Sequence, residues 1–311
     1  MARQLEGRHP PGLRILLAHD PSAPTDGSVA LLADASWAAG TVVRVVTSPA
    51  GVGPPLSSFA NLREIRDHAA EVRTTIDHAH ERVAADLRAA GLSVETAIVH
   101  GKPQRAILNA AERFGADLIV VGARDQGPLA ATLLGSVSRS VVEDAASSVL
   151  VVRGASLDRV LLSADGSSAA GAATAVVAGW PAFAESRVLV VAVGEGAPRY
   201  PRSVLDPDTW RSAFRETITA SSDAACDQAD AAATQLAASG REVEVEIRLG
   251  DVAAEVVAAA REWPADLVVV GTNGRPFLER LLVGGVARRI LDGVEASVLV
   301  VRDPERRPET V

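Results

Sequence analysis

Short apolar runs alternate along the chain with longer segments whose apolar residues recur every three or four positions. In the first half this pattern predicts strands at residues 15–18, 42–47, 94–99, 118–121 and 149–152, and helices at residues 30–39, 62–87, 104–114 and 137–144. Gly91 follows the longest helix and is expected to end it. Continuous apolar strands between helices are typical of a parallel sheet covered on both faces.

The second half of the chain repeats the first at a fixed spacing. Ala116–Gly122 recurs as Ala265–Gly271, and Ser147–Arg153 recurs as Ala296–Arg302, in both cases 149 residues further on. Solenoid repeats are about 20 to 50 residues long, so this longer period indicates a duplicated domain instead.

The repeat predicts both the fold class and the domain boundaries. We expect two tandem doubly wound α/β domains, at residues 12–153 and 157–302, each with a five-stranded mainly parallel sheet and helices on both faces. The second domain should follow the same element order. Residues 195–208, which are rich in Gly and Pro, are predicted to form a loop before its long helix.

Composition narrows the classes of function. The net charge of −8 argues against a general affinity for nucleic acid or for anionic membrane surfaces. No apolar run approaches the roughly 18 residues that span a membrane, and the first residues do not resemble a signal peptide. The single cysteine, Cys226, excludes an intramolecular disulfide, which suits a reducing compartment. The sequence therefore predicts a soluble, cytoplasmic protein.

Candidate binding residues follow the first and fourth predicted strands of each half. An aspartate, Asp20 or Asp165, comes directly after the first strand. After the fourth strand, the second half reads Gly-Thr-Asn-Gly, nine residues, then Gly-Gly, and the first half reads Gly-Ala-Arg-Asp, nine residues, then Gly-Ser. Glycines between a strand and the next helix let backbone N–H groups approach a phosphate, which the helix N-terminus also favours. In such sheets ligands bind at the carboxyl ends of the strands.

These features resemble the universal stress protein family in its tandem form, and the resemblance covers both halves nearly end to end. It implies the adenine nucleotide alpha hydrolase-like fold and the binding of ATP, with Mg²⁺ as its companion ion. In the second half the implied binding residues are Asp165, Val193, Val270, Gly271, Gly274, Gly284, Gly285 and Val286. In the first half they are Asp20, Val121, Gly122, Gly135, Ser136 and Val137, with Thr47 where the family usually has a valine.

Each half departs from the family's loop pattern at one position. Asp125 replaces the second glycine of the first half, and a negative charge beside a triphosphate costs on the order of several kcal/mol at low dielectric. Gly285 replaces a Ser or Thr in the second half, which removes one hydroxyl but keeps the backbone N–H. We therefore expect ATP to bind in the second half, and weakly or not at all in the first.

Two other classes of function are considered, an interaction module and an adenylyl-transferring enzyme. The chain could be an interaction module without nucleotide, in which the apolar strands that end in Arg153 and Arg302 pair as sheet edges. One half would then pair with the other as a pseudo-dimer within the chain, and two chains could form a homodimer. An adenylyl-transferring enzyme would need a histidine-rich signature after the first strand, and neither half has one. We expect a regulatory stress-response protein and no enzyme, with any ATP hydrolysis slow and incidental.

The histidines of the first half are not expected to form a site. His68, His78 and His80 lie on the long predicted helix without a cysteine or carboxylate cluster, so solvated surface positions are expected. His19 precedes Asp20, but adjacent residues at a strand end point in opposite directions, which disfavours a catalytic pair.

Overall fold

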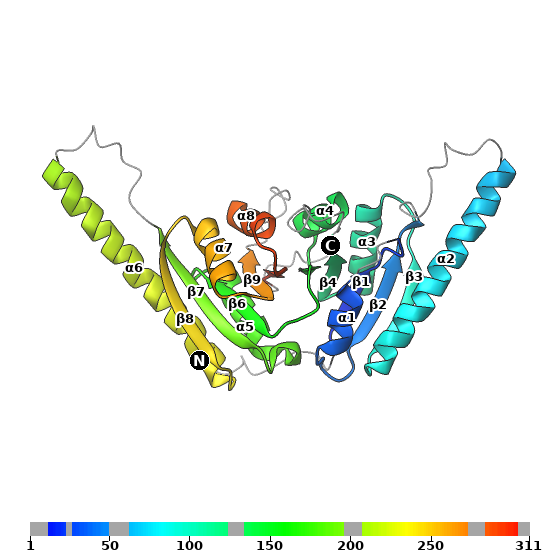
Figure 1. Cartoon of the computed structure of the whole chain (residues 1–311), viewed down its shortest axis with the longest axis horizontal. Helices are drawn as coiled ribbons and strands as arrows, with labels where there is room; N and C mark the ends of the chain where they lie inside the picture. The colour runs from blue at the N-terminus through cyan, green and yellow to red at the C-terminus, as the bar shows by residue number, and fades with distance from the viewer. Residues whose placement is uncertain are drawn as a thin grey trace. The chain divides into compact units, whose positions relative to one another are not determined.

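A computed structural model describes residues 12–22, 27–49, 62–123, 134–195, 207–272 and 284–303 (Figure 1). The described residues fall into two compact units, which meet in the sequence between Ala155 and Ser156. No helix within these ranges is both long enough and apolar enough to cross a membrane.

The first unit alternates strands and helices as the apolar pattern predicts. Its elements are β1 (Arg14–Ala18), α1 (Gly27–Asp34), β2 (Val42–Thr47), α2 (Leu62–Ala89), β3 (Ser93–Ile98), α3 (Pro103–Phe114), β4 (Leu118–Gly122), α4 (Ser136–Asp144) and β5 (Ser148–Val152). The strands lie in the order β3-β2-β1-β4-β5, and every pairing within this unit is parallel. The strand order reverses between β1 and β4, which places their carboxyl ends at a topological switch point.

The second unit repeats this arrangement. Its elements are β6 (Arg159–Ala164), α5 (Ser168–Gly179), the short 3₁₀ helix η3 (Pro181–Phe183), β7 (Arg187–Glu195), α6 (Pro207–Ala238), β8 (Val243–Gly250), α7 (Val252–Glu262), β9 (Leu267–Thr272), α8 (Gly285–Gly293) and β10 (Ser297–Arg302). The order is β10-β9-β6-β7-β8, with all strands parallel and the switch point between β6 and β9.

Helices cover both faces of each sheet (Figure 1). In the first unit α1 packs against α2 and α3 packs against α4, and in the second unit α5 pairs with α6 and α7 with α8 in the same way. Right-handed crossovers place the two pairs of each unit on opposite faces of its sheet. The central strands are buried on both faces by Val, Leu, Ile and Ala side chains. The predicted fold class, two tandem doubly wound α/β domains, is confirmed.

Most predicted boundaries agree with the structure to within two residues, and those of the first helix differ by more. The first helix, predicted at residues 30–39, begins at Gly27 and ends at Asp34, because the chain must turn before it enters β2. Gly40 makes that turn with φ of 84°, and the hydroxyl of Thr41 donates to the carbonyl of Ala38. In the predicted loop at 195–208, Glu195 still belongs to β7 and α6 has begun at Pro207, while residues 196–206 lie outside the described part of the chain.

His80 is buried, so the prediction that it lies on a solvated surface is wrong. Its side chain is only 4% exposed, and its Nε2 lies 3.0 Å from the hydroxyl of Thr47 on β2. That hydroxyl donates to the carbonyl of His19 at 2.9 Å, and it can therefore accept from His80. His78, two positions earlier on the same helix, is exposed. The spacing of apolar residues did not indicate which of the two histidines faces the sheet.

We predict that His80 makes the free energy of unfolding depend on pH. Burial, and secondarily the neighbouring His19, lower the pKa of His80, with Asp77 opposing them. As the pH falls below the unfolded value of about 6.5, the unfolded chain therefore binds a proton that the native state refuses, and stability decreases. His80→Gln removes the titrating group and should lose less stability between about pH 7 and pH 5.

Urea unfolding curves at the two pH values test this expectation. His78→Gln, an exposed change on the same helix, should keep the pH dependence of the unaltered chain. An equal loss of stability in the His80→Gln and His78→Gln variants would contradict the assignment.

Candidate functional site

A cavity of about 520 Å³ lies in the second unit at the carboxyl ends of β6, β7 and β9. This is the switch point of the sheet, where open α/β folds bind their ligands. The cavity is lined by Ser163, Asp165, Ala170, Val193, Gly194, Ser221, Ala224, Ala225, Gln228, Val252, Val270, Gly271, Thr272, Gly284, Val286, Ala287 and Ile290. The lining is largely apolar, with a few polar side chains that converge on it.

Most residues predicted for the second half meet at this cavity. The lining includes six of them, namely Asp165, Val193, Val270, Gly271, Gly284 and Val286. They meet because β6 pairs with β7 on one side and with β9 on the other, so that the three strands end at one edge of the sheet. Gly285 is the first residue of α8, beside Gly284. Gly274 lies outside the described residues.

Asp165 is held at the junction of β6 and α5. Its Oδ1 accepts a hydrogen bond from the backbone N–H of Ser167 at 2.9 Å. The Ser167 hydroxyl in turn accepts from the N–H of Ala170 and caps the N-terminus of α5. In the described part of the chain, no hydrogen bond engages Oδ2 of Asp165. The carboxylate is therefore positioned by the backbone and keeps an acceptor for a ligand.

Gly271 has a structural role that the sequence did not indicate. A Cβ at this position would lie 2.2 Å from the carbonyl oxygen of Ala169 and 2.6 Å from the N–H nitrogen of Ala170. The first turn of α5 thus rests directly on the end of β9, which only a glycine permits. By contrast, a Cβ at Gly284 or Gly285 would meet nothing within 4 Å. Gly271 is therefore required by packing, whereas Gly284 and Gly285 are not.

We predict that Gly271→Ala destabilises the second unit whether or not ligand is present. The methyl group forces α5 away from β9, and overpacking of this kind costs about 1–3 kcal/mol. Gly284→Ala adds the same methyl group in open space at a φ of −51°, so its thermal unfolding should match the unaltered chain. If the two variants unfolded at the same temperature, the packing role of Gly271 would be refuted.

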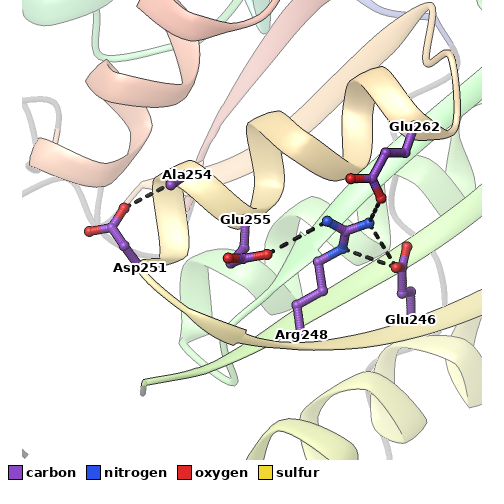
Figure 2. Close-up of polar contacts among 6 residues, drawn as sticks. All are labelled: Glu246, Arg248, Asp251, Ala254, Glu255 and Glu262. Atoms are coloured by element: carbon purple, nitrogen blue, oxygen red, sulfur yellow. Dashed lines mark hydrogen bonds and ion pairs between the residues drawn. The ribbon is translucent and has the colours of Figure 1, made fainter. Parts of the chain in front are cut away.

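A polar network centred on Arg248 joins β8 to α7 (Figure 2). Arg248 on β8 has a side chain only 11% exposed, and it donates to Glu246 on its own strand and to Glu262 on α7. Glu255 on α7 adds an ion pair at 3.6 Å. The hydrogen bond to Glu262 is the main cause that raises the pKa of Arg248, and it lowers the pKa of Glu262. These contacts attach the edge strand β8 to the helix packed against it.

A second group of polar contacts, around Asp251, joins α7 to α8. Asp251 caps α7 by accepting from the N–H of Ala254 at 2.9 Å (Figure 2). It also accepts from Arg289 on α8 at 2.8 Å, and this hydrogen bond is the main cause that lowers the pKa of Asp251. Both α7 and α8 contribute lining residues, Val252 and Val286, at their N-termini. Asp251 therefore ties together the two helix ends that border the cavity.

The predicted residues of the first unit also gather at strand ends. Ala18 of β1 pairs with Val121 of β4, so Asp20, just after β1, and Gly122, the last residue of β4, lie at the same edge of the sheet. Asp20 differs from Asp165 because its Oδ1 accepts from both the N–H and the hydroxyl of Ser22. Gly135 caps α4, and Ser136 and Val137 form its first turn.

Asp125 and Thr47 are the residues of the first unit that differ from the family's usual pattern. Asp125 lies outside the described residues, so its effect stays a prediction. Thr47 ends β2 and bonds His80 and His19, which engages its hydroxyl within the protein. In the second unit the equivalent position is Ala192, which pairs with Ile247 as Thr47 pairs with Ile98, and the next residue, Val193, lines the cavity.

The wall contributed by α6 was not predicted. Four lining residues come from this helix, Ser221, Ala224, Ala225 and Gln228. The available signal was the unusual run of small residues on its inner face, where Ala225, Ala229 and Ala232 are buried. No group of three or more His, Cys, Asp or Glu residues within the described ranges is arranged to hold a metal ion.

Comparisons with known proteins agree with this architecture. A universal stress protein of Mycolicibacterium smegmatis is 29% identical over 310 residues, covering 93% of this chain and 96% of that protein. One of Mycobacterium tuberculosis is 29% identical over 290 residues, which cover 84% of each. The crystal structure of a universal stress protein from Archaeoglobus fulgidus covers 93% of this chain and 96% of its own, with a TM-score of 0.62 and 20% identity, and so shares the fold.

The family comparison covers both units. The sequence profile of the universal stress protein family (Usp) matches residues 13–153 and, separately, residues 156–302. The two matches together contain every described helix and strand, from β1 to β10. This chain therefore belongs to the universal stress protein family and carries two of the family's domains in tandem.

Proposed function

We propose that the second unit binds an adenine nucleotide, ATP above all, and that the chain acts as a nucleotide-dependent regulatory protein in a stress response. The cavity at the ends of β6, β7 and β9 carries this proposal. Its volume of about 520 Å³ suits a small-molecule site, which typically encloses about 300–1,000 Å³. It combines an acidic group, an apolar wall and a helix N-terminus in one space.

The N-terminus of α8 would hold the phosphates. Gly284 occupies the N-cap position without a side-chain cap, so the first N–H groups of the helix keep their capacity to donate. The helix dipole adds partial positive charge at this end. Because a Cβ at Gly284 or Gly285 would meet only open space, the absence of side chains here leaves room for a ligand. Any Mg²⁺ would be carried mainly by the phosphates, as is usual for this ion.

The opposite part of the cavity would hold the nucleoside. Val193 and Val270 supply apolar surface for the base. Asp165 presents a carboxylate oxygen that can accept a hydrogen bond from a ribose hydroxyl or from the base. No general base or arginine pointing at the phosphate end can be assembled from the motif residues that the structure describes, so slow, incidental hydrolysis at most is part of the proposal.

We predict a single ATP site per chain that depends on Asp165. Isothermal titration calorimetry with ATP and Mg²⁺ should give a stoichiometry near one. Asp165→Ala should weaken binding by about tenfold or more, as expected for the loss of a charged hydrogen bond of about 1.5–3 kcal/mol. Asp20→Ala removes the corresponding carboxylate of the first unit and serves as the matched control, with binding unchanged.

The alternative is an interaction module that binds no nucleotide, and the same protein preparation distinguishes the two. If the second unit binds ATP, denaturing the purified chain should release adenine nucleotide, or adding ATP and Mg²⁺ should raise its unfolding temperature. If neither is observed, the interaction module is favoured, with β5 and β10 as its pairing strands because each ends the strand order of its own unit. Two equal ATP sites would refute the predicted asymmetry.

A further inference from the structure

The two long helices can be compared position by position because they end in the same way. In α2 the N–H of Gly91 donates to Arg88 and that of Leu92 donates to Leu87. In α6 the N–H of Gly240 donates to Ala237 and that of Arg241 donates to Leu236. Each pair of equivalent residues is 149 positions apart, which is also the spacing of the sequence repeat.

At this spacing the inner faces of the helices differ in size. In α2 the buried positions include Val72, Ile76 and His80, and Ile76 is fully buried. The equivalent positions in α6 are Ser221, Ala225 and Ala229. Ser221 and Ala225 line the cavity of the second unit, so space that branched or aromatic side chains fill in the first unit is left open in the second.

Gln228 of α6 lies against the loop that carries Asp165. A Cβ on Gly166 would lie 2.9 Å from Cγ of Gln228 and 3.3 Å from its Nε2, so the amide lies against the backbone directly after Asp165. Gly166 has a φ of +71°, which favours glycine. The first unit has Pro21 at the position of Gly166 and the buried Ala79 at the position of Gln228.

The amide of Gln228 is available to a ligand. Gln228 lines the cavity, and none of the hydrogen bonds within the described part of the chain involves its side chain. A glutamine amide offers one acceptor oxygen and an NH₂ donor side by side. Adenine presents the complementary pair, because its exocyclic amino group is flanked by ring nitrogens that accept.

We propose that α6 is the base-recognising wall of the nucleotide site. Ala225 leaves the space for the base, and the Gln228 amide accepts from the 6-amino group while donating to the adjacent ring nitrogen. This inference rests on the proposed function and deepens it, because it assigns base recognition to a helix outside the glycine motif. It also gives a reason, independent of Asp125, for the first unit to lack a site.

The test separates the base from the phosphates by titrating ATP, purine riboside triphosphate, which lacks the 6-amino group, and inorganic triphosphate. The unaltered chain should bind ATP about tenfold more tightly than purine riboside triphosphate, as expected for a hydrogen bond to a base edge. Gln228→Ala should remove this difference and leave the affinity for inorganic triphosphate unchanged. Gln235→Ala, an exposed glutamine change on the same helix, should keep the difference.

Ala225→Ile introduces the first unit's residue and should abolish measurable ATP binding while sparing inorganic triphosphate. Ala231→Ile, at an exposed position of α6, is its control and should bind ATP normally. If the unaltered chain binds no ATP, the proposed function fails and this inference falls with it. If the unaltered chain binds ATP and Gln228→Ala still distinguishes ATP from purine riboside triphosphate as well as the unaltered chain does, only the role of α6 is refuted.

Discussion

The contact on which the second unit's site depends is the direct packing of backbone on backbone where α5 meets the end of β9. Gly271 makes this approach possible, because any Cβ would overlap the carbonyl of Ala169. The approach fixes α5, and with it the capping residue Ser167 and the carboxylate of Asp165 that hydrogen-bonds to the backbone of Ser167. A residue that a motif search would assign to ligand binding is thus first a condition for the shape of the strand ends.

The remaining borders of the cavity are held by polar contacts. The Asp251–Arg289 pair connects the N-terminal part of α7 with α8, and the Arg248 cluster attaches α7 to β8. The Asp251–Arg289 pair is exposed and contributes little to stability by itself, but together with the contacts of the largely buried Arg248 it restricts the orientation of the elements that are joined. Packing sets one side of the cavity and this network sets the other.

The sequence predicted most of the fold, because period-two and period-3.6 patterns are local properties and the repeat supplied two readings of each element. It also predicted that Asp165, Gly271 and Gly284 meet, since parallel strands end at one edge. It could not predict the burial of His80 or the wall formed by α6, because both depend on how closely a long helix approaches a sheet. A run of alanines is compatible with an open space beside Ala225 or with a helix that lies closer to the sheet, so the sequence alone did not predict the cavity wall.

The difference between Ile76 and Ala225 has a consequence for how the copies respond to heat. Each buried methylene contributes about 0.8 kcal/mol, so the alanine-lined face of α6 secures its helix less strongly than the face of α2 does. Occupation of the cavity would restore part of the missing contact and raise the stability of the second unit by mass action. If the second unit binds a nucleotide as proposed, the order of one long helix would depend on the concentration of that ligand, whereas the corresponding helix of the first unit packs on a core filled by Ile76.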